Sequence, residues 1–357
     1  MKGQSVLFMI IILDVAAFLV IGLGTFGQHG GTPAPAPSCA ADWFDANYTS
    51  RYPNNISYSG TGVTQFPYVL NGSTGFWFEG VNQLVWSNGT ANSLEYLYFN
   101  TTNYTEAVNG GRIATEAEFG SSLGNNTPTA VWNSSFKAVW HMSNPRDSTN
   151  NSKTFTVLSG TLVPGKIGNG YNDMTGNKTS DADFNGTASG GFTIEGWVNL
   201  STTGWQTMVS KAIGSADADA QFLLQYYNAV TFCAGQSPGF SFVLRSNLGW
   251  NCANYATNPT ATVGKWYYVA GTFDGTNLRI YVDGVLRNTT AIVGTYQTTT
   301  TNLFFGKRGI GDAPLDGILD EVRYSNTVMP ASYFLAVNQS MTPTGNFSVF
   351  GTPTTCP

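Results

Sequence analysis

The sequence predicts an all-β protein that follows a single hydrophobic helix at the N-terminus. Aromatic residues make up 14% of the chain and glycines number 41, while only 10% of the residues are charged. Aromatic and β-branched residues favour strands, and glycine supplies turns. Short apolar runs alternate with turn residues at a spacing of roughly 8–12 positions, which is typical of antiparallel sandwiches. The net charge of −5 excludes nucleic acid as a partner, because nucleic-acid binding requires a basic face.

Residues 1–24 are predicted to form a membrane-length helix. The run from Val6 to Leu23 is apolar apart from Asp14 and one glycine, and at about 1.5 Å per residue it spans a bilayer core. Lys2 is the only basic residue before Arg51, so the N-terminus is expected in the cytoplasm and the rest outside. A secretory signal peptide, the rival interpretation, would have a shorter apolar region and a small-x-small cleavage site. Residues 25–38 form a Gly/Pro linker whose TPAPAPS stretch favours an extended spacer.

The KGQS start resembles the class III leader of archaeal type IV pilin-like proteins. In that family a very short basic leader, here residues 1–3, is removed just before the hydrophobic helix. The resemblance therefore implies cleavage between Gly3 and Gln4 and self-assembly through the helix. Two interpretations of Asp14 stay open: it contacts a polar group of a neighbouring copy, or it is a charge that an otherwise apolar helix tolerates.

Glycosylation sequons predict an extracellular location. Fifteen of the 32 asparagines begin an Asn-x-Ser/Thr sequon, against roughly six expected from the serine and threonine content, and all follow the apolar segment. We expect these sequons on exposed turns and strand faces, with Asn185 and Asn288 the strongest candidates. The predicted sites are Asn47, Asn55, Asn71, Asn88, Asn100, Asn103, Asn125, Asn133, Asn150, Asn177, Asn185, Asn199, Asn288, Asn338 and Asn346.

The four cysteines are predicted to form two disulfides. Their spacing fits no metal site and the chain has only two histidines, which excludes a Cys/His zinc site. An even number of cysteines in an exported chain favours disulfides, and three pairings are open. We favour Cys233–Cys252, which are close in sequence, and Cys39–Cys356, which would join the two ends of the extracellular part.

Residues 39–136 are predicted to form a β-sandwich domain. The stretch SLEYLYFNTTNYTEAV resembles the end of a β domain that precedes laminin-G-like modules in prokaryotic surface proteins. The resemblance covers Leu94 to Asn100 and the stretch from Thr115 to Phe119, and the opening part of the domain departs from that family.

Residues 137–357 are predicted to form a second β domain with a C-terminal tail. In FTIEGWVNL the alternation places Phe192, Ile194 and Val198 on the buried face and Trp197 on the opposite face. Asp283-Gly284 lies between two strand-like runs and favours a type I′ hairpin turn. This region resembles a laminin-G-like, concanavalin-type jelly roll over roughly residues 137–340, through FTIEGWV, WYYVAGTFDGTNLRIYVDG and LDGILDEVRYSN. The resemblance implies two antiparallel sheets packed face to face, in modules that bind glycans, bind proteins or serve as structural units.

The sequence indicates a protein without catalytic activity. Concanavalin-fold glycosidases carry paired carboxylates on one strand in the order E-x-D-x-x-E, and no such run occurs here. Asp316, Asp320 and Glu321 come nearest, but they belong to the closing motif of the laminin-G-like family. In that family Asp320 would help to fix the final strand. No cofactor is required.

Two kinds of binding site are open in the sequence. A structural Ca²⁺ would need hard oxygen ligands, for which Asp147, Asp217 and Asp219 are the candidates. Their alternative roles are a turn cap for Asp147 and solvated loop acids for the other two. Aromatic side chains that stack on sugar rings, or that belong to the core instead, are the remaining candidates: Trp205, Tyr226, Tyr227 and Trp250.

The main functional hypothesis is a structural subunit of an extracellular filament or pilus, which polymerises through its N-terminal helix and exposes a glycosylated β-rich head that mediates adhesion. The alternative is a membrane-anchored, lectin-like adhesin that binds surface glycans. An extracellular glycosidase ranks third. All three place the chain at the cell surface, with its helix in the membrane or in a filament core.

Replacing Asp14 with Leu separates the two interpretations of the helix. In a filament core the buried carboxylate needs a partner or a proton, so Asp14→Leu should abolish or misregister assembly while the β domains still fold. In a simple anchor, display should be unchanged and membrane insertion should improve by about 2.5–3.5 kcal/mol. Electron microscopy of surface material that shows normal filaments at normal yield would identify Asp14 as a tolerated charge.

Overall fold

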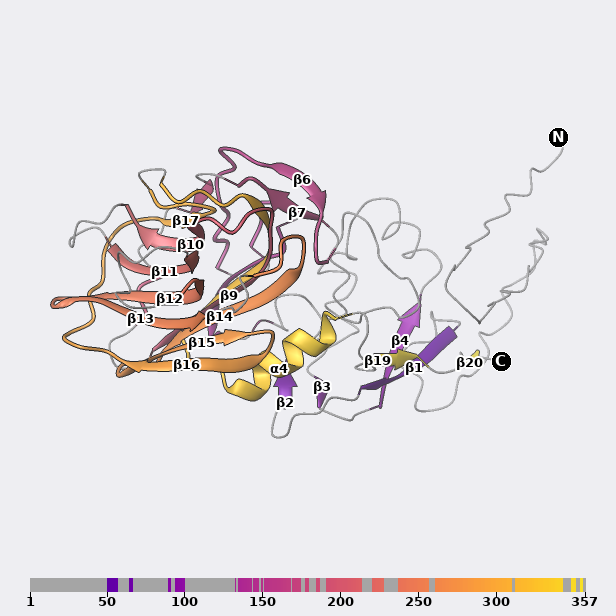
Figure 1. Ribbon diagram of the computed structural model, residues 1–357. Helices are drawn as coiled ribbons and strands as arrows, with labels where there is room; N and C mark the ends of the chain where they lie inside the picture. Colours follow the sequence, from indigo (N-terminus) through magenta and orange to yellow (C-terminus); the bar gives the residue numbers. More distant parts are fainter. Residues whose placement is uncertain are drawn as a thin grey trace.

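The structure is a computed structural model (Figure 1). It describes residues 50–56, 64–66, 89–90, 94–99, 132, 134–142, 144–147, 149, 151–167, 169–174, 177–179, 184–186, 191–213, 220–227, 237–256, 261–309, 312–342, 348–350 and 354–355. The predicted N-terminal helix and the linker lie outside these residues, as do Gly3, Gln4 and Asp14. No helix within the described ranges is long and apolar enough to cross a membrane.

Two antiparallel sheets form the larger part of the described chain, which confirms the predicted jelly roll. The first sheet has the strand order β13-β12-β11-β10-β17-β8. Its strands are β8 (Asn177–Thr179), β10 (Gln206–Ala212), β11 (Ala220–Tyr227), β12 (Gly239–Ser246), β13 (Gly249–Ala256) and β17 (Leu303–Phe305). The two sheets lie face to face as successive layers (Figure 1).

The second sheet has eight strands in the order β16-β15-β14-β9-β18-β7-β6, and β5 also pairs with β18. Its strands are β5 (Phe136–Trp140), β6 (Thr161–Pro164), β7 (Asn169–Asn172), β9 (Phe192–Leu200), β14 (Trp266–Phe273), β15 (Asn277–Val282), β16 (Val285–Ala291) and β18 (Gly317–Ser325). Helix α4 (Ala331–Ser340) follows β18.

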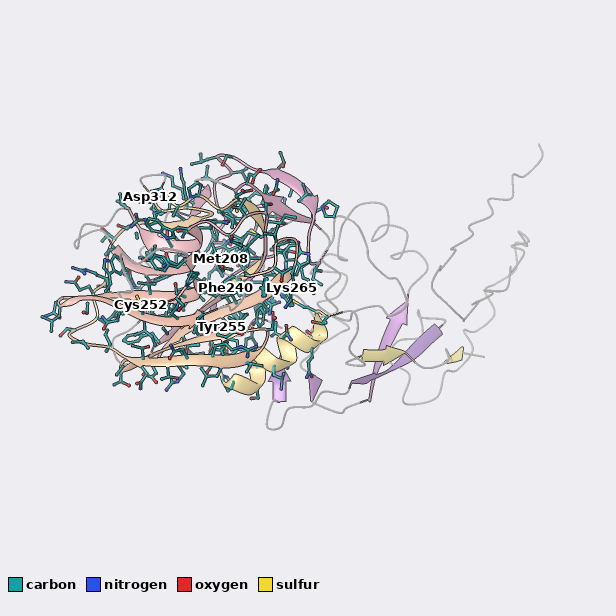
Figure 2. All side chains as sticks on the ribbon, viewed as in Figure 1. Met208, Phe240, Cys252, Tyr255, Lys265 and Asp312 are labelled. Atoms are coloured by element: carbon teal, nitrogen blue, oxygen red, sulfur yellow. The ribbon has the colours of Figure 1, made fainter. Side chains whose placement is uncertain are left out.

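The sandwich core lies between the two sheets and follows from strand alternation. Phe192, Ile194 and Val198 belong to this core, together with side chains of the facing sheet such as Phe240 and Met208 (Figure 2). Trp197 points to the opposite face of β9, where it belongs to a second apolar cluster that includes Phe334 of α4. The predicted alternation of FTIEGWVNL is therefore confirmed, and its outward tryptophan is covered by the helix.

Local turn chemistry and side-chain bonds close the edge of the sandwich. Asp283 and Gly284 have φ angles of 52° and 77°, the positive values that a type I′ turn requires. Beyond this turn, β16 contacts the edge strand of the other sheet. The side-chain amide of Asn288 donates to the carbonyl oxygen of Asn254 at 2.8 Å, and the Thr290 hydroxyl donates to the carbonyl oxygen of Cys252 at 2.9 Å.

A smaller sheet joins the two ends of the described chain. Strand β1 (Ser50–Ile56) pairs antiparallel with β4 (Leu94–Phe99), β19 (Ser348–Phe350) and β20 (Thr354–Thr355). Strands β2 (Thr64–Phe66) and β3 (Gly89–Thr90) form a separate pair. The C-terminal segment, predicted as a tail of the jelly roll, thus pairs with the first strand of the preceding region.

The register places Thr355 opposite Ser50, which is the proximity that a Cys39–Cys356 disulfide needs. Both of these cysteines lie outside the described residues, so this pairing stays a prediction. Cys252 is disulfide-bonded, and the described part of the chain contains no free cysteine. Its partner also lies outside the described residues, so the pairing with Cys233 remains a prediction.

Replacing Gly271 with Ala tests the close approach of the two sheets. A Cβ atom at Gly271 would lie 2.4 Å from the ring of Phe242 in the facing sheet, so the substitution should lower the free energy of unfolding by about 1–3 kcal/mol. Gly204→Ala is the matched control, because a Cβ atom added at Gly204 would have nothing within 4 Å. The measurement is denaturant unfolding of the full-length chain, and equal midpoints for the two variants would contradict this sheet spacing.

Candidate functional site

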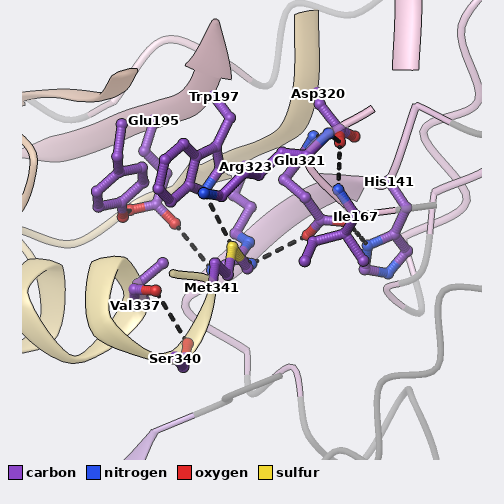
Figure 3. A network of polar contacts seen from close by, with 12 residues as sticks. His141, Ile167, Glu195, Trp197, Asp320, Glu321, Arg323, Val337, Ser340 and Met341 are labelled. Atoms are coloured by element: carbon purple, nitrogen blue, oxygen red, sulfur yellow. Dashed lines mark hydrogen bonds and ion pairs between the residues drawn. The ribbon is translucent and has the colours of Figure 1, made fainter. Parts of the chain in front are cut away.

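A buried ionic cluster lies between the eight-stranded sheet and α4 (Figure 3). At its centre Arg323 of β18 bridges two carboxylates: Nη1 lies 3.4 Å from Oε1 of Glu195, and Nη2 lies 3.0 Å from Oε2 of Glu321. All three residues are buried. The Arg323 guanidinium also lies 5.1 Å from the ring centroid of Trp132. The charges therefore compensate one another in an environment from which water is excluded.

Hydroxyl and imidazole groups complete the cluster. Tyr268 of β14 and Tyr333 of α4 each donate a hydroxyl hydrogen bond of 2.7 Å to Glu195, and Nδ1 of His141 lies 2.7 Å from Oε1 of Glu321. Burial raises the pKa of Glu195, although Arg323 and the two hydroxyls act in the opposite direction. Burial alone would raise the pKa of Glu321 too, but His141 and Arg323 lower it below its ordinary value of 4.5. The two glutamates thus differ in how readily they take up a proton.

Asp320 fixes β18 to the loop before β7. Its Oδ2 accepts backbone hydrogen bonds from Lys166 at 2.7 Å and Ile167 at 2.9 Å, and its Oδ1 accepts one from Glu321 at 2.7 Å. Glu321 has a φ of 48°, and the strand register shifts between Asp320 and Arg323. This bulge lets neighbouring acids bond to different partners. Burial and the nearby Glu321 charge raise the pKa of Asp320. The role that the family resemblance implied for Asp320 is the one observed.

These acids therefore hold the fold together. A glycosidase needs two carboxylates that flank a bound substrate, whereas Glu195, Asp320 and Glu321 are buried and bonded to structural partners. The described residues also contain no group of three or more His, Cys, Asp or Glu side chains that could hold a metal ion.

Asp147 caps a turn, which was the alternative to a calcium role. Its Oδ1 accepts hydrogen bonds from the backbone of Val139 and Thr149, both at 2.9 Å. Its Oδ2 accepts from the Thr149 hydroxyl and from the backbone of Lys153, both at 2.8 Å. The carboxylate thereby holds together the turn that follows β5. Asp217 and Asp219 lie outside the described residues, where a calcium site stays a prediction.

The four candidate aromatic residues divide into two pairs. Tyr226 is buried in the core between the sheets, and Tyr227 is buried in a small cluster that also contains Leu223 of the same strand. Trp205 and Trp250 pack against that small cluster and are half-buried. The structure therefore leaves the two tryptophans as candidate ligand contacts on the side of β11 that faces away from the core.

Polar partners position both tryptophans. Nε1 of Trp205 donates to Oε1 of Gln225 at 3.0 Å, and the Arg308 guanidinium lies 4.9 Å from the Trp205 ring. Arg308 is itself paired with Asp312, near the upper edge of the jelly roll in Figure 2. The Arg245 guanidinium lies 5.4 Å from the ring of Trp250. Sequence reasoning missed these partners, although strand pairing of a tight hairpin could have placed Arg245 opposite Trp250.

Four predicted glycosylation sites have described side chains, all half-buried. Oδ1 of Asn185 accepts a hydrogen bond from Nζ of the buried Lys211 at 2.7 Å, and Nδ2 of Asn199 donates to the carbonyl oxygen of Gly264 at 3.0 Å. The other two are Asn288 and Asn338. Asn55 and Asn177 lie in β1 and β8, and the remaining sequons lie outside the described residues. Glycan occupancy stays a prediction at every site.

The comparisons with known proteins identify the jelly roll. Residues 172–332 match the family described as the concanavalin A-like lectin/glucanases superfamily. This segment therefore carries a domain of that superfamily, as the laminin-G-like resemblance implied. A comparison with curated proteins found no match.

Solved structures show similarity in the general fold. Domain 4 of the extracellular GH43 arabinanase AbnA from Geobacillus stearothermophilus, solved with arabinotriose, is 20% identical with a TM-score of 0.45, over 57% of this chain and 98% of that one. The binding domain of Paraclostridial Mosquitocidal Protein 1 is 11% identical with a TM-score of 0.46, over 58% and 52%. A Trypanosoma rangeli sialidase is 16% identical with a TM-score of 0.39, over 57% and 31%. Similarity at this level identifies no ligand for this chain.

The two buried glutamates should give opposite pH dependences of stability. Because the folded-state pKa of Glu321 lies below 4.5, its ion pairs stabilise the fold above the unfolded value and are lost as the pH falls through the folded pKa. Glu321→Gln should therefore lose about 3–5 kcal/mol at neutral pH, because a buried charge is left unpaired, and the deficit should shrink on acidification.

Glu195→Gln is the matched control. The pKa of Glu195 is raised in the fold, so the wild-type group favours stability as the pH falls, and its removal should abolish a slope of opposite sign. Urea unfolding between about pH 3 and pH 7 measures both slopes. A Glu321→Gln deficit that stays constant over this range would contradict the assigned ion pairs.

Proposed function

We propose that this chain is an exported, surface-anchored, lectin-like protein whose jelly roll binds glycans. The match of residues 172–332 to a superfamily described by its lectins and glucanases supports this function more than a filament subunit. The surface location is proposed from the hydrophobic N-terminal segment and the abundance of sequons. Surface glycans are the proposed partners, and the membrane is the proposed anchor.

Binding without hydrolysis fits the observed acids better than catalysis does. Each carboxylate of the closing motif that is buried has structural partners, and Asp316 is half-buried with no second acid assigned to it. We therefore propose that the domain holds a glycan without cleaving it. A structural Ca²⁺ at Asp217 and Asp219 is compatible with this role and belongs to the same proposal.

The observation that carries the glycan site is the pair of half-buried tryptophans on the sheet that contains β10 to β13. An indole ring offers a flat apolar surface on which the face of a sugar ring can pack, with polar groups at its edge. At Trp205 the polar groups are Gln225, Arg308 and Asp312, and at Trp250 the adjacent group is Arg245. Each tryptophan is thus a preformed site for one sugar ring.

Self-assembly through the N-terminal helix remains a separate proposal. It depends on the KGQS leader resemblance and on Asp14, and the comparisons give no support for a pilus subunit. The same chain could be anchored or polymerised without any change in its jelly roll.

Alanine substitutions of the tryptophans test the glycan site. A glycan array with the full-length chain would first identify a ligand, and isothermal titration calorimetry would then measure its affinity. Trp205→Ala or Trp250→Ala should lower this affinity at least about tenfold, because about 1.4 kcal/mol of ring contact is lost. Trp266→Ala is the control, because Trp266 is also half-buried but packs against the cluster under α4.

The variants must keep the wild-type unfolding midpoint for the comparison to hold. A ligand whose affinity is unchanged in both Trp205→Ala and Trp250→Ala would move the site elsewhere on the domain. A glycan array without any bound glycan at millimolar concentration would overturn the lectin-like function itself.

A further inference from the structure

The two most exposed large apolar side chains of the described residues lie side by side. Leu248 is 71% exposed and Val293 is 64% exposed. Leu248 belongs to the turn between β12 and β13, and Val293 belongs to the loop after β16. A Cβ atom at Gly294 would lie 3.0 Å from Cγ of Leu248, so Leu248 lies over the loop that carries Val293. We call residues 246–249 and 292–296 together the apolar tip; its turn lies at the left end of the jelly roll in Figure 1.

Hydrogen bonds hold the apolar tip in one conformation. The backbone N–H of Asn247 donates to the carbonyl oxygen of Thr295 at 3.0 Å, and Thr295 N–H donates back to Oδ1 of Asn247 at 2.7 Å. The Ser246 hydroxyl donates to the carbonyl oxygen of Val293 at 2.6 Å, and Val293 N–H donates to Oδ1 of Asn251 at 2.7 Å. Both apolar side chains are therefore presented on a fixed backbone, which lowers the entropic cost of docking.

The sequence around the apolar tip lacks predicted glycans. Residues 200–287 contain six asparagines and none begins a sequon, whereas 15 of the other 26 asparagines do. One of the six is followed by Pro-Thr, which proline disqualifies. These residues include β10 to β15. On a chain with so many sequons elsewhere, this sheet and its turn stay accessible to a protein partner.

We propose that the apolar tip is a contact between two copies of this chain. Residues 246–249 and 292–296 contain no Lys, Arg, Asp or Glu, so two identical tips can meet without like-charge repulsion. A two-fold contact uses the same surface on both copies and is the commonest arrangement of homo-oligomers. A lipid surface fits less well, because interfacial membrane binding usually relies on basic residues beside the apolar ones.

The size of the apolar tip sets the strength of this contact. Two side chains per copy bury far less than the roughly 1,200 Å² of a small stable interface. The contact is therefore weak between free molecules and becomes effective where copies are held close together, as on one membrane, because a second contact then forms at high local concentration.

Cysteine cross-linking of the full-length chain, reconstituted at high density in lipid vesicles, tests the contact. Leu248→Cys should form a covalent dimer on oxidation with copper phenanthroline and dissolved oxygen, at least about tenfold faster than Val263→Cys. Val263 is a matched control, because it is 51% exposed and lies in the turn before β14, in a different loop. Equal rates for the two variants would overturn the proposal.

A second variant separates self-contact from other roles of the apolar tip. Leu248→Asp, combined with Val293→Cys, places like charges across the two-fold contact and should slow cross-linking at least about tenfold relative to Val293→Cys alone. Its unfolding midpoint should be unchanged, because the Leu248 side chain is mostly exposed. An unchanged rate would contradict a contact between copies. A fluorophore on Leu248→Cys that shifts on protein-free vesicles would assign the apolar tip to lipid and would also overturn the proposal.

Discussion

The arrangement of β9, β18 and α4 depends on one buried guanidinium. Arg323 is bonded to Glu195 on the neighbouring strand and to Glu321 on its own strand. Tyr333 of α4 donates to the same Glu195 oxygen and lies 3.3 Å from Arg323, so the helix is placed by the same charges as the sheet. An unpaired charge at this depth would cost several kcal/mol. The helix therefore has one energetically favoured position over Trp197.

Local chemistry determined the parts of the fold that the sequence could predict. The alternation of Phe192, Ile194 and Val198 and the Asp283-Gly284 turn each depend on a few neighbouring residues. The ionic cluster depends instead on Glu195 and Arg323, which lie 128 positions apart. Period-two alternation indicates which side of a strand a residue faces but not what covers that side. It also fails at the bulge of Glu321, where the register shifts.

The same limit explains the candidate binding residues. Tyr226 and Tyr227 are adjacent in sequence, so they face opposite sides of β11, and whether the outward one is exposed depends on segments distant in the chain. The structure buries both. Asp147 was more predictable, because three of its four hydrogen bonds come from residues within six positions. Arg308 comes from a loop with no pattern that indicates Trp205 as its neighbour.

The scarcity of charge links the core to the surface. Only 10% of the chain is charged, yet seven buried residues in the described part are charged: Glu195, Lys211, Arg245, Arg308, Asp320, Glu321 and Arg323. The fold thus uses much of its charge internally, as paired groups or beside aromatic rings, and leaves a surface composed mainly of Asn, Thr, Ser and Gly. Such a surface attracts ligands weakly over long distances, because steering requires uncompensated charge. Recognition must then come from short-range contacts, such as the rings of Trp205 and Trp250, which salt screens very little.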